Sequence, residues 1–161
     1  GRILVASRGK AGRIHVFSPA GEHLAAWGDS GSAQGKLSSV SSLAVAPGGE
    51  VVVTCIATEK AVQVFAGSGA YLLGFGVHDI GPGNFSLPNG VVVTPDSRIW
   101  VTDGIRHLVQ VFDLTGKLLG VLGGGEGPGA LYYPSALASD GRGMFALVET
   151  GGKRLRLWWV R

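Results

Sequence analysis

One feature constrains the fold of this chain more than any other: a sequence motif that recurs, with variation, every 46 to 48 residues. The first glycine of the motif recurs as Gly35, Gly83 and Gly129. The aromatic residue near the end of the motif recurs as Phe17, Phe65, Phe112 and Trp158. A fixed period in the forties indicates that each copy is one supersecondary unit, which buries its apolar face only by stacking on its neighbours.

Each copy divides into four short apolar segments, a to d, separated by turn residues. Segment a spans 43–46, 91–94 and 137–139, and segment b spans 3–6, 51–54, 99–102 and 144–148. Segment c spans 14–16, 62–64, 109–111 and 155–157, and segment d spans 24–27, 71–75 and 118–122. Segment c alternates strictly, which is typical of strands that pack on one face, and its polar members are expected on the other face: His15, Gln63, Gln110 and Arg156. Four hairpin-linked strands make a β-meander, and a repeated meander predicts the blades of an all-β propeller.

The composition of the 161 residues fits a β-rich protein. Hydrophobic residues make up 45% of the chain and charged residues 16%, which disfavours disorder. The 28 glycines cluster between apolar runs, where they punctuate short strands. No apolar run approaches the roughly 18 residues of a membrane span, and no signal peptide is apparent, so no membrane partner is expected. Cys55 is the only cysteine, and the lack of a disulfide framework favours a cytoplasmic location.

The segment 83–113 resembles an NHL repeat. The family pattern is matched in its opening by Gly83, Phe85, Pro88, Gly90 and Val91, and in its middle by Ile99, Val101 and Asp103. Its end is matched by His107, Leu108, Val109, Gln110, Val111, Phe112, Gly116 and Lys117. Arg106 replaces the asparagine of the signature, and in other copies Cys55 and Glu149 stand where Asp103 does. The resemblance implies an NHL-type β-propeller, a fold that usually has six blades.

The strand count predicts about three and a half four-stranded blades in one propeller segment, 1–161. Their expected bounds are 1–28 (partial), 41–76, 90–123 and 136–161 (partial). Six blades at this period would need roughly 280 residues, so we expect the missing blades upstream and a natural C-terminus. An open arc would expose an inter-blade apolar face and unpaired strand edges, so the segment is either part of a longer chain or self-associates through that face.

Propeller geometry sorts the loops between two faces. The b–c turns and the d–a connections emerge together on what we call the upper face, and the a–b and c–d turns emerge on the lower face. Although the net charge is only +3, basic and aromatic residues concentrate on the upper face. The predicted binding rim comprises Arg8, Lys10, Arg13, Lys60, Arg106, His107, Tyr132, Lys153 and Arg154. Such a rim suits acidic or phosphate-bearing partners, and the alternative is a solvated face whose cations maintain solubility.

Two functions follow from this sequence. The first is a non-catalytic module whose upper face binds a protein partner, and the resemblance implies substrate recruitment of the kind performed by tripartite-motif RING-type ubiquitin ligases. The alternative is RNA binding by the basic rim. No catalytic group, cofactor or metal site is expected, because the histidines show no paired spacing for a metal: His15, His23, His78 and His107. Asp103 and Glu149 are expected to accept backbone N–H bonds in their turns.

Overall fold

The computed structural model describes residues 1–7 and 12–160, and all regular elements in these ranges are β-strands. The first eight are β1 (Ile3–Ser7), β2 (Arg13–Phe17), β3 (His23–Trp27), β4 (Asp29–Ser30), β5 (Lys36–Leu37), β6 (Val40–Val45), β7 (Val51–Cys55) and β8 (Val62–Phe65). The others are β9 (Tyr71–Phe75), β10 (Pro88–Val93), β11 (Ile99–Asp103), β12 (Leu108–Phe112), β13 (Leu118–Gly123), β14 (Pro134–Ser139), β15 (Met144–Glu149) and β16 (Arg154–Trp159). The described residues contain no helix long and apolar enough to cross a membrane.

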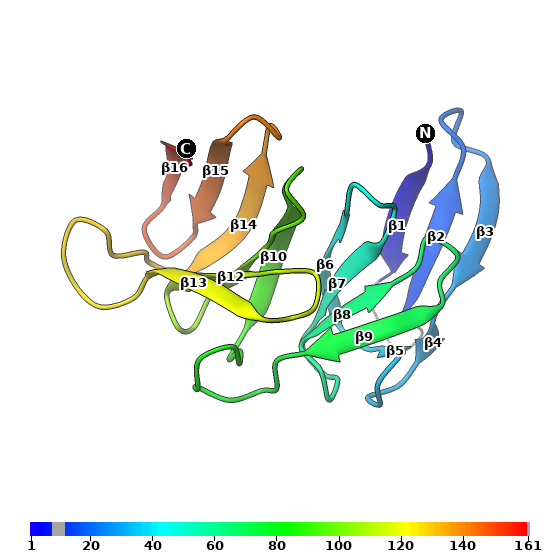
Figure 1. Cartoon of the computed structure of the whole chain (residues 1–161), viewed down its shortest axis with the longest axis horizontal. Helices are drawn as coiled ribbons and strands as arrows, with labels where there is room; N and C mark the ends of the chain where they lie inside the picture. Colours follow the sequence, from blue (N-terminus) through cyan, green and yellow to red (C-terminus); the bar gives the residue numbers. More distant parts are fainter. Residues whose placement is uncertain (8–11, 161) are drawn as a thin grey trace.

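Four antiparallel meanders follow one another along the chain. The second (β6–β9) and third (β10–β13) have all four strands, a to d. The first sheet (β1–β3) has strands b, c and d, and the fourth (β14–β16) has strands a, b and c. Figure 1 shows the sheets as an arc running from the blue first sheet to the fourth sheet, coloured orange to dark red. The predicted fold class, an all-β partial propeller, is confirmed, and the short parallel pair β4–β5 lies in the first d–a connection.

The pairing registers repeat with the sequence. A register shift between strands c and d falls at the periodic aromatic residue of the first three sheets: Phe17, Phe65 and Phe112. A second shift falls near the start of each strand a, between Val40 and Ser42 in the second sheet and at matching points in the next two. Such irregularities increase local twist, so their repetition gives each sheet the same shape.

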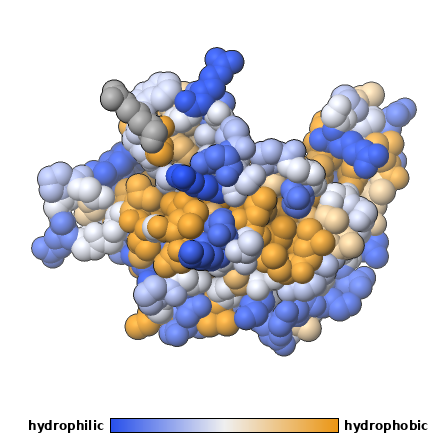
Figure 2. All heavy atoms as spheres, viewed as in Figure 1, coloured by the Kyte–Doolittle hydropathy of each residue, from blue (hydrophilic) through white to orange (hydrophobic). Residues whose placement is uncertain are grey.

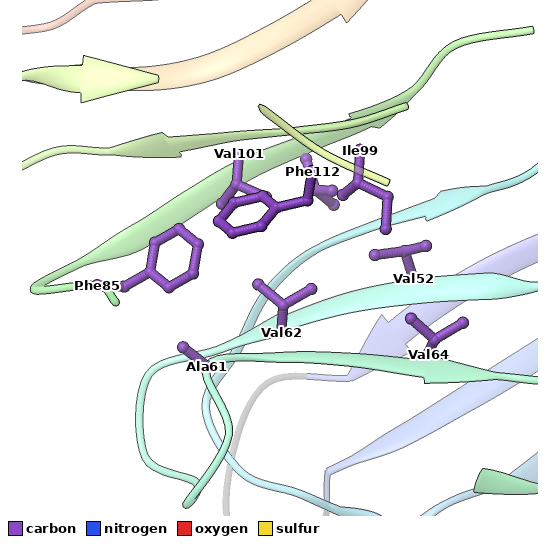
Figure 3. Packing of buried hydrophobic residues seen from close by; sticks show 9 residues of the cluster. Val52, Ala61, Val62, Val64, Phe85, Ile99, Val101 and Phe112 are labelled. Carbon is purple, nitrogen blue, oxygen red and sulfur yellow. The ribbon is translucent and has the colours of Figure 1, made fainter. Parts of the chain in front are cut away.

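The hydrophobic core lies between successive sheets. Val52, Val62 and Val64 of the second sheet pack with Ile99, Val101 and Phe112 of the third, and all are buried (Figure 3). Phe85, from the connection between these sheets, is fully buried in the same cluster. Similar clusters join the first sheet to the second and the third to the fourth. Each sheet therefore buries its apolar face only against a neighbour, as the repeat predicts.

Apolar side chains remain exposed where a sheet has no neighbour. On β16, Leu155, Leu157 and Trp159 are 61%, 63% and 66% exposed. At the other end of the arc, Ile3 and Val5 of β1 are also exposed. A further apolar area covers the outer strands β9 and β13 (Figure 2), where the exposed residues include Leu72, Leu119 and Val121.

Candidate functional site

The upper face is organised around the b–c turn of the third sheet, residues 104–107. From this turn, Nη1 of Arg106 donates hydrogen bonds to the carbonyl oxygens of Gly81 and Asn84, at 3.0 and 2.6 Å. Both acceptors lie in the connection between the second and third sheets. Arg106 belongs to the predicted binding rim, and its guanidinium holds this connection in place.

His107, in the same turn, contacts the next connection along the chain. Its Nδ1 accepts the backbone N–H of Tyr133 at 2.9 Å, and its carbonyl oxygen accepts the N–H of Gly124. The His107 ring lies parallel to that of Tyr132, with centroids 5.1 Å apart and an interplanar angle of 3°. Tyr132 keeps 58% of its surface exposed. The turn and the connection therefore present a supported aromatic surface to solvent.

Glu149, at the end of β15, is the centre of a second group. Its carboxylate is fully buried and accepts hydrogen bonds from Arg154 Nε (2.6 Å), Arg156 Nε and the backbone N–H of Tyr132. The two guanidinium groups also donate to the carbonyl oxygen of Ala130. Arg154, predicted for the rim, is thus largely occupied with an internal carboxylate and the connection 124–133.

This arrangement fixes the charge state of Glu149. Burial by itself would raise the pKa of the carboxyl, but the hydrogen bonds from Arg154, Tyr132 N–H and Arg156 outweigh it, and the pKa falls below its usual range. The same carboxylate raises the pKa of Arg154 by hydrogen bonding. Glu149 therefore carries a negative charge at neutral pH and acts as a structural anion.

The remaining predicted rim residues differ in how freely they face solvent. Arg13 and Lys153 are exposed, and Lys60 is half-buried. Arg8 and Lys10 lie outside the described residues. The exposed rim that the structure describes is consequently less basic than the sequence suggests, because Arg106 and Arg154 hold the connections.

The last residue of strand b is an acid in the third and fourth sheets, and in both it accepts a backbone N–H from the preceding connection. Asp103 accepts the backbone N–H groups of Ser86, Leu87 and Arg106, at 2.8, 3.1 and 3.2 Å. Tyr132 occupies the position in the fourth repeat that Ser86 occupies in the third, and its backbone N–H donates to Glu149. The expected turn contact is confirmed for Asp103 by the Arg106 N–H, whereas the backbone donor to Glu149 lies in the preceding connection.

Cys55 takes the same position in the second sheet. Burial raises the pKa of its thiol, although hydrogen bonding, first from the Ser38 backbone, opposes the rise. Ser38 corresponds to Ser86 in the register of strands a and b. The buried Cys55 therefore occupies the position that Asp103 and Glu149 occupy in the next two sheets.

Two buried glutamines were not recognised from the sequence as contacts of the connections. Gln63 accepts the N–H of Gly35 and donates to the carbonyl of Lys36, both at 2.7 Å. Gln110 accepts the N–H of Gly83 at 2.9 Å and donates to the carbonyl of Asn84 at 2.8 Å. Both lie on the non-core side of strand c, as the alternation predicts, and this side is covered by the preceding connection. A polar residue at the same register of two repeats is the signal that could have identified them.

The structure also brings together two histidines that the sequence appears to scatter. Across the β2–β3 hairpin, Nδ1 of His15 lies 3.4 Å from Nε2 of His23. The spacing of the histidines in the sequence did not reveal this contact, in which the two ring nitrogens lie within hydrogen-bonding distance. No group of three or more His, Cys, Asp or Glu side chains suited to a metal occurs within 1–7 and 12–160.

A hollow lies away from the predicted rim. A cavity of about 420 Å³ opens on the lower face between the a–b turns of the third and fourth sheets. Trp100 and Phe145 form its apolar wall, and Asp96, Arg98 and Arg142 contribute charge. Asp96 and Arg98 pair with each other at 3.0 Å, so the charges at this hollow are partly neutralised.

Comparison with known proteins supports the fold and one repeat. The family model for the NHL repeat matches residues 85–112, and no curated protein matches the chain. A structural genomics protein of unknown function from Bacteroides thetaiotaomicron VPI-5482 aligns with a TM-score of 0.63 and 13% identity, covering 99% of this chain and 56% of that one. XC5397 from Xanthomonas campestris, described as a gluconolactonase, aligns with a TM-score of 0.65 and 22% identity, covering 93% of this chain and 45% of that one.

This chain resembles both solved structures in its fold. The chain spans about half the length of each. At these identities the likeness shows the fold alone. The chain is thus a partial β-propeller that contains an NHL repeat at 85–112.

Proposed function

We propose that this chain is a non-catalytic recognition module whose upper face binds a protein partner. The observation that carries the proposal is the parallel pair of His107 and Tyr132, in which the tyrosine ring is largely exposed. Tyrosine is enriched among the residues that dominate binding energy at protein interfaces. An exposed aromatic ring on a rigid support fits this role.

Rigidity of the support favours binding, because groups that are already ordered lose little entropy when a partner arrives. Tyr132 is held by its N–H bond to Glu149, and Tyr133 by its bond to His107. The fourth b–c turn also closes on the pair: a side-chain carbon at Gly151 would lie 2.5 Å from the Tyr132 ring. The Tyr132 ring therefore contacts His107 and the turn at Gly151, and the rest of its surface is exposed.

The NHL repeat extends this proposal to a biological setting. Through its resemblance to the propellers of tripartite-motif ligases, the module would recruit substrates for ubiquitin transfer in the cytoplasm. The family match at 85–112 supports an NHL repeat, and the ligase setting rests on the resemblance alone. The setting is tested by asking whether captured partners become ubiquitinated in cells that express this chain.

RNA binding is the second candidate. Exposed Lys153 and Arg13, with the aromatic surface of Tyr132, supply phosphate-binding and stacking groups. The use of Arg106 and Arg154 in internal contacts weakens this candidate, because it leaves fewer cations for phosphates. We therefore place it after protein recognition.

The decisive experiment compares partners of the wild-type chain with those of Tyr132→Ala. Trp159→Ala is the matched control, since Trp159 is an exposed aromatic residue on a different face. Quantitative cross-linking mass spectrometry should show at least one protein whose enrichment falls by about tenfold or more with Tyr132→Ala. The Trp159→Ala chain should retain it. Equal capture by all three chains would contradict the proposed face.

Two further measurements separate the alternatives. Binding of fluorescent hairpin and single-stranded RNA across a salt series should be weak, and steep salt dependence abolished by Lys153→Glu would favour RNA instead. Hydrolysis of a gluconolactone, the activity named for XC5397, should not exceed the buffer rate. Turnover proportional to protein concentration would contradict a non-catalytic role.

A further inference from the structure

The His15 and His23 pair lies on the open side of the first sheet. His15 is in strand c and His23 begins strand d, so the hairpin between them brings residues eight positions apart into contact. Ile14 and Val16, on the other side of β2, are buried toward the second sheet. The imidazoles therefore face away from this core, and among the described residues His23 is exposed and His15 is half-buried.

The distance between the two ring nitrogens matches the geometry of a metal ligand pair. A zinc–imidazole bond is about 2.0–2.1 Å, so two nitrogens on one tetrahedral ion are about 3.3–3.4 Å apart. His15 Nδ1 and His23 Nε2 are 3.4 Å apart. At this distance the two nitrogens can share a hydrogen bond, so a bound ion would replace the shared proton and both lone pairs would turn towards it.

The rings are also oriented by a neighbour. Phe17 packs edge-on against His23 at 5.3 Å and lies 6.4 Å from His15, which restricts both imidazoles to the same side of the hairpin. Directly across β1 from His15 is Val5, an uncharged neighbour. The nearest cation along β2, Arg13, interacts electrostatically with Asp29.

We propose that His15 and His23 form a binding site for a divalent transition-metal ion of the zinc class, which imidazole ligands favour. The protein supplies two nitrogen ligands, and the other positions are open to water or to a donor from outside the described chain. A bound ion would connect β2 and β3 and stabilise the folded chain, since the unfolded chain does not hold the two rings together. The site is separate from the upper face and does not depend on its function.

Isothermal titration of the full chain with ZnCl2 tests the site, with MgCl2 as the ion that imidazole binds poorly. We expect one zinc per chain, and a Tm that rises with zinc and not with magnesium. His15→Gln and His23→Gln should each weaken zinc binding by about tenfold or more. His78→Gln, which removes an exposed histidine from another loop, should leave binding unchanged.

The proposal is wrong if the wild type binds no zinc, or if both hairpin variants bind as tightly as the wild type. A measurement on the wild type alone guards against misfolded variants. Electron paramagnetic resonance of the Cu²⁺-loaded chain should show coupling to two imidazole nitrogens, because copper favours the same ligands. Coupling to fewer than two would equally overturn the assignment.

Discussion

A side-chain carbon on Gly76 would lie 2.6 Å from the ring of Phe85. Gly76 directly follows strand d of the second sheet and has a φ of 67°, and Phe85 is the buried aromatic residue of the connection. Gly123 has the same relationship to Leu131 one repeat later, with a φ of 76° and the same 2.6 Å distance. The end of strand d thus needs glycine for both its backbone angle and its packing.

The first prediction follows from this contact. Gly76→Ala should lower the free energy of unfolding by about 2–4 kcal/mol, combining left-handed strain with a clash against Phe85 and the Gly83 carbonyl. Gly21→Ala is the matched control, because Gly21 also has a positive φ but no atom within 4 Å of the added carbon. Urea denaturation should show a smaller loss, of about 1–2 kcal/mol, for the control. Equal losses would mean that strain alone explains the glycine.

A second prediction concerns the buried carboxylate. Glu149→Gln should destabilise the chain by about 2–3 kcal/mol, since it leaves Arg154 and Arg156 without their anion while both remain partly solvated. Glu126→Gln, on an exposed part of the connection, should change stability by less than about 0.5 kcal/mol. The measurement is again urea denaturation. A Glu149 variant as stable as the wild type would contradict the described network.

The third prediction is that the stability difference between the wild type and Glu149→Gln depends on pH. The pKa of Glu149 is lowered in the folded state, so its contribution is complete above the unfolded value, near 4.5, and is lost as pH falls through the folded pKa. The stability gap between wild type and Glu149→Gln should therefore stay constant from neutral pH down to about 5 and shrink in more acidic solution. Chemical denaturation at a series of pH values measures the gap. A gap that widens in acid would reverse the sign and disprove the assignment.

A fourth prediction concerns the exposed face of β16. The open apolar residues Leu157 and Trp159 should promote self-association, because large exposed apolar patches favour contact with a second surface. Light scattering after size exclusion should show mass increasing with protein concentration. Replacing both by Lys should reduce that increase, whereas Thr115→Lys, on the lower face, should not. A monomer at all concentrations would exclude this self-association.

The sequence was sufficient to predict the blades because their signals are local and repeated. Alternation around Val109 and Val111 defines a strand, and a glycine or aspartate after it defines a turn. The fate of individual polar side chains could not be predicted in this way. Arg106 reads as an exposed cation, but its acceptor Gly81 lies 25 residues away in the sequence. Arg154 pairs with Glu149 five residues away, a contact that depends on the pairing of β15 with β16.

The histidine pair illustrates the same limit. His15 and His23 fall in different segments of the repeat, and only the register of β2 on β3 brings their nitrogens together. A shift between Val16 and Phe17 contributes to that register; the periodic phenylalanine marks its position, but nothing in the spacing of the two histidines indicates that they meet. Spacing alone was therefore insufficient to find the pair.

The contacts of Gln63 and Gln110 redefine which stretch of chain is the exchangeable module. Each glutamine secures the connection that precedes its own sheet, so a cut between a connection and the following sheet would separate the loop from its anchor. The stretch 76–123, a connection with its following sheet, keeps the Gln110 anchor, the Asp103 acceptor and the Phe85 packing together. Insertion or deletion of blades should respect this boundary, which is offset from the sheets seen in Figure 1.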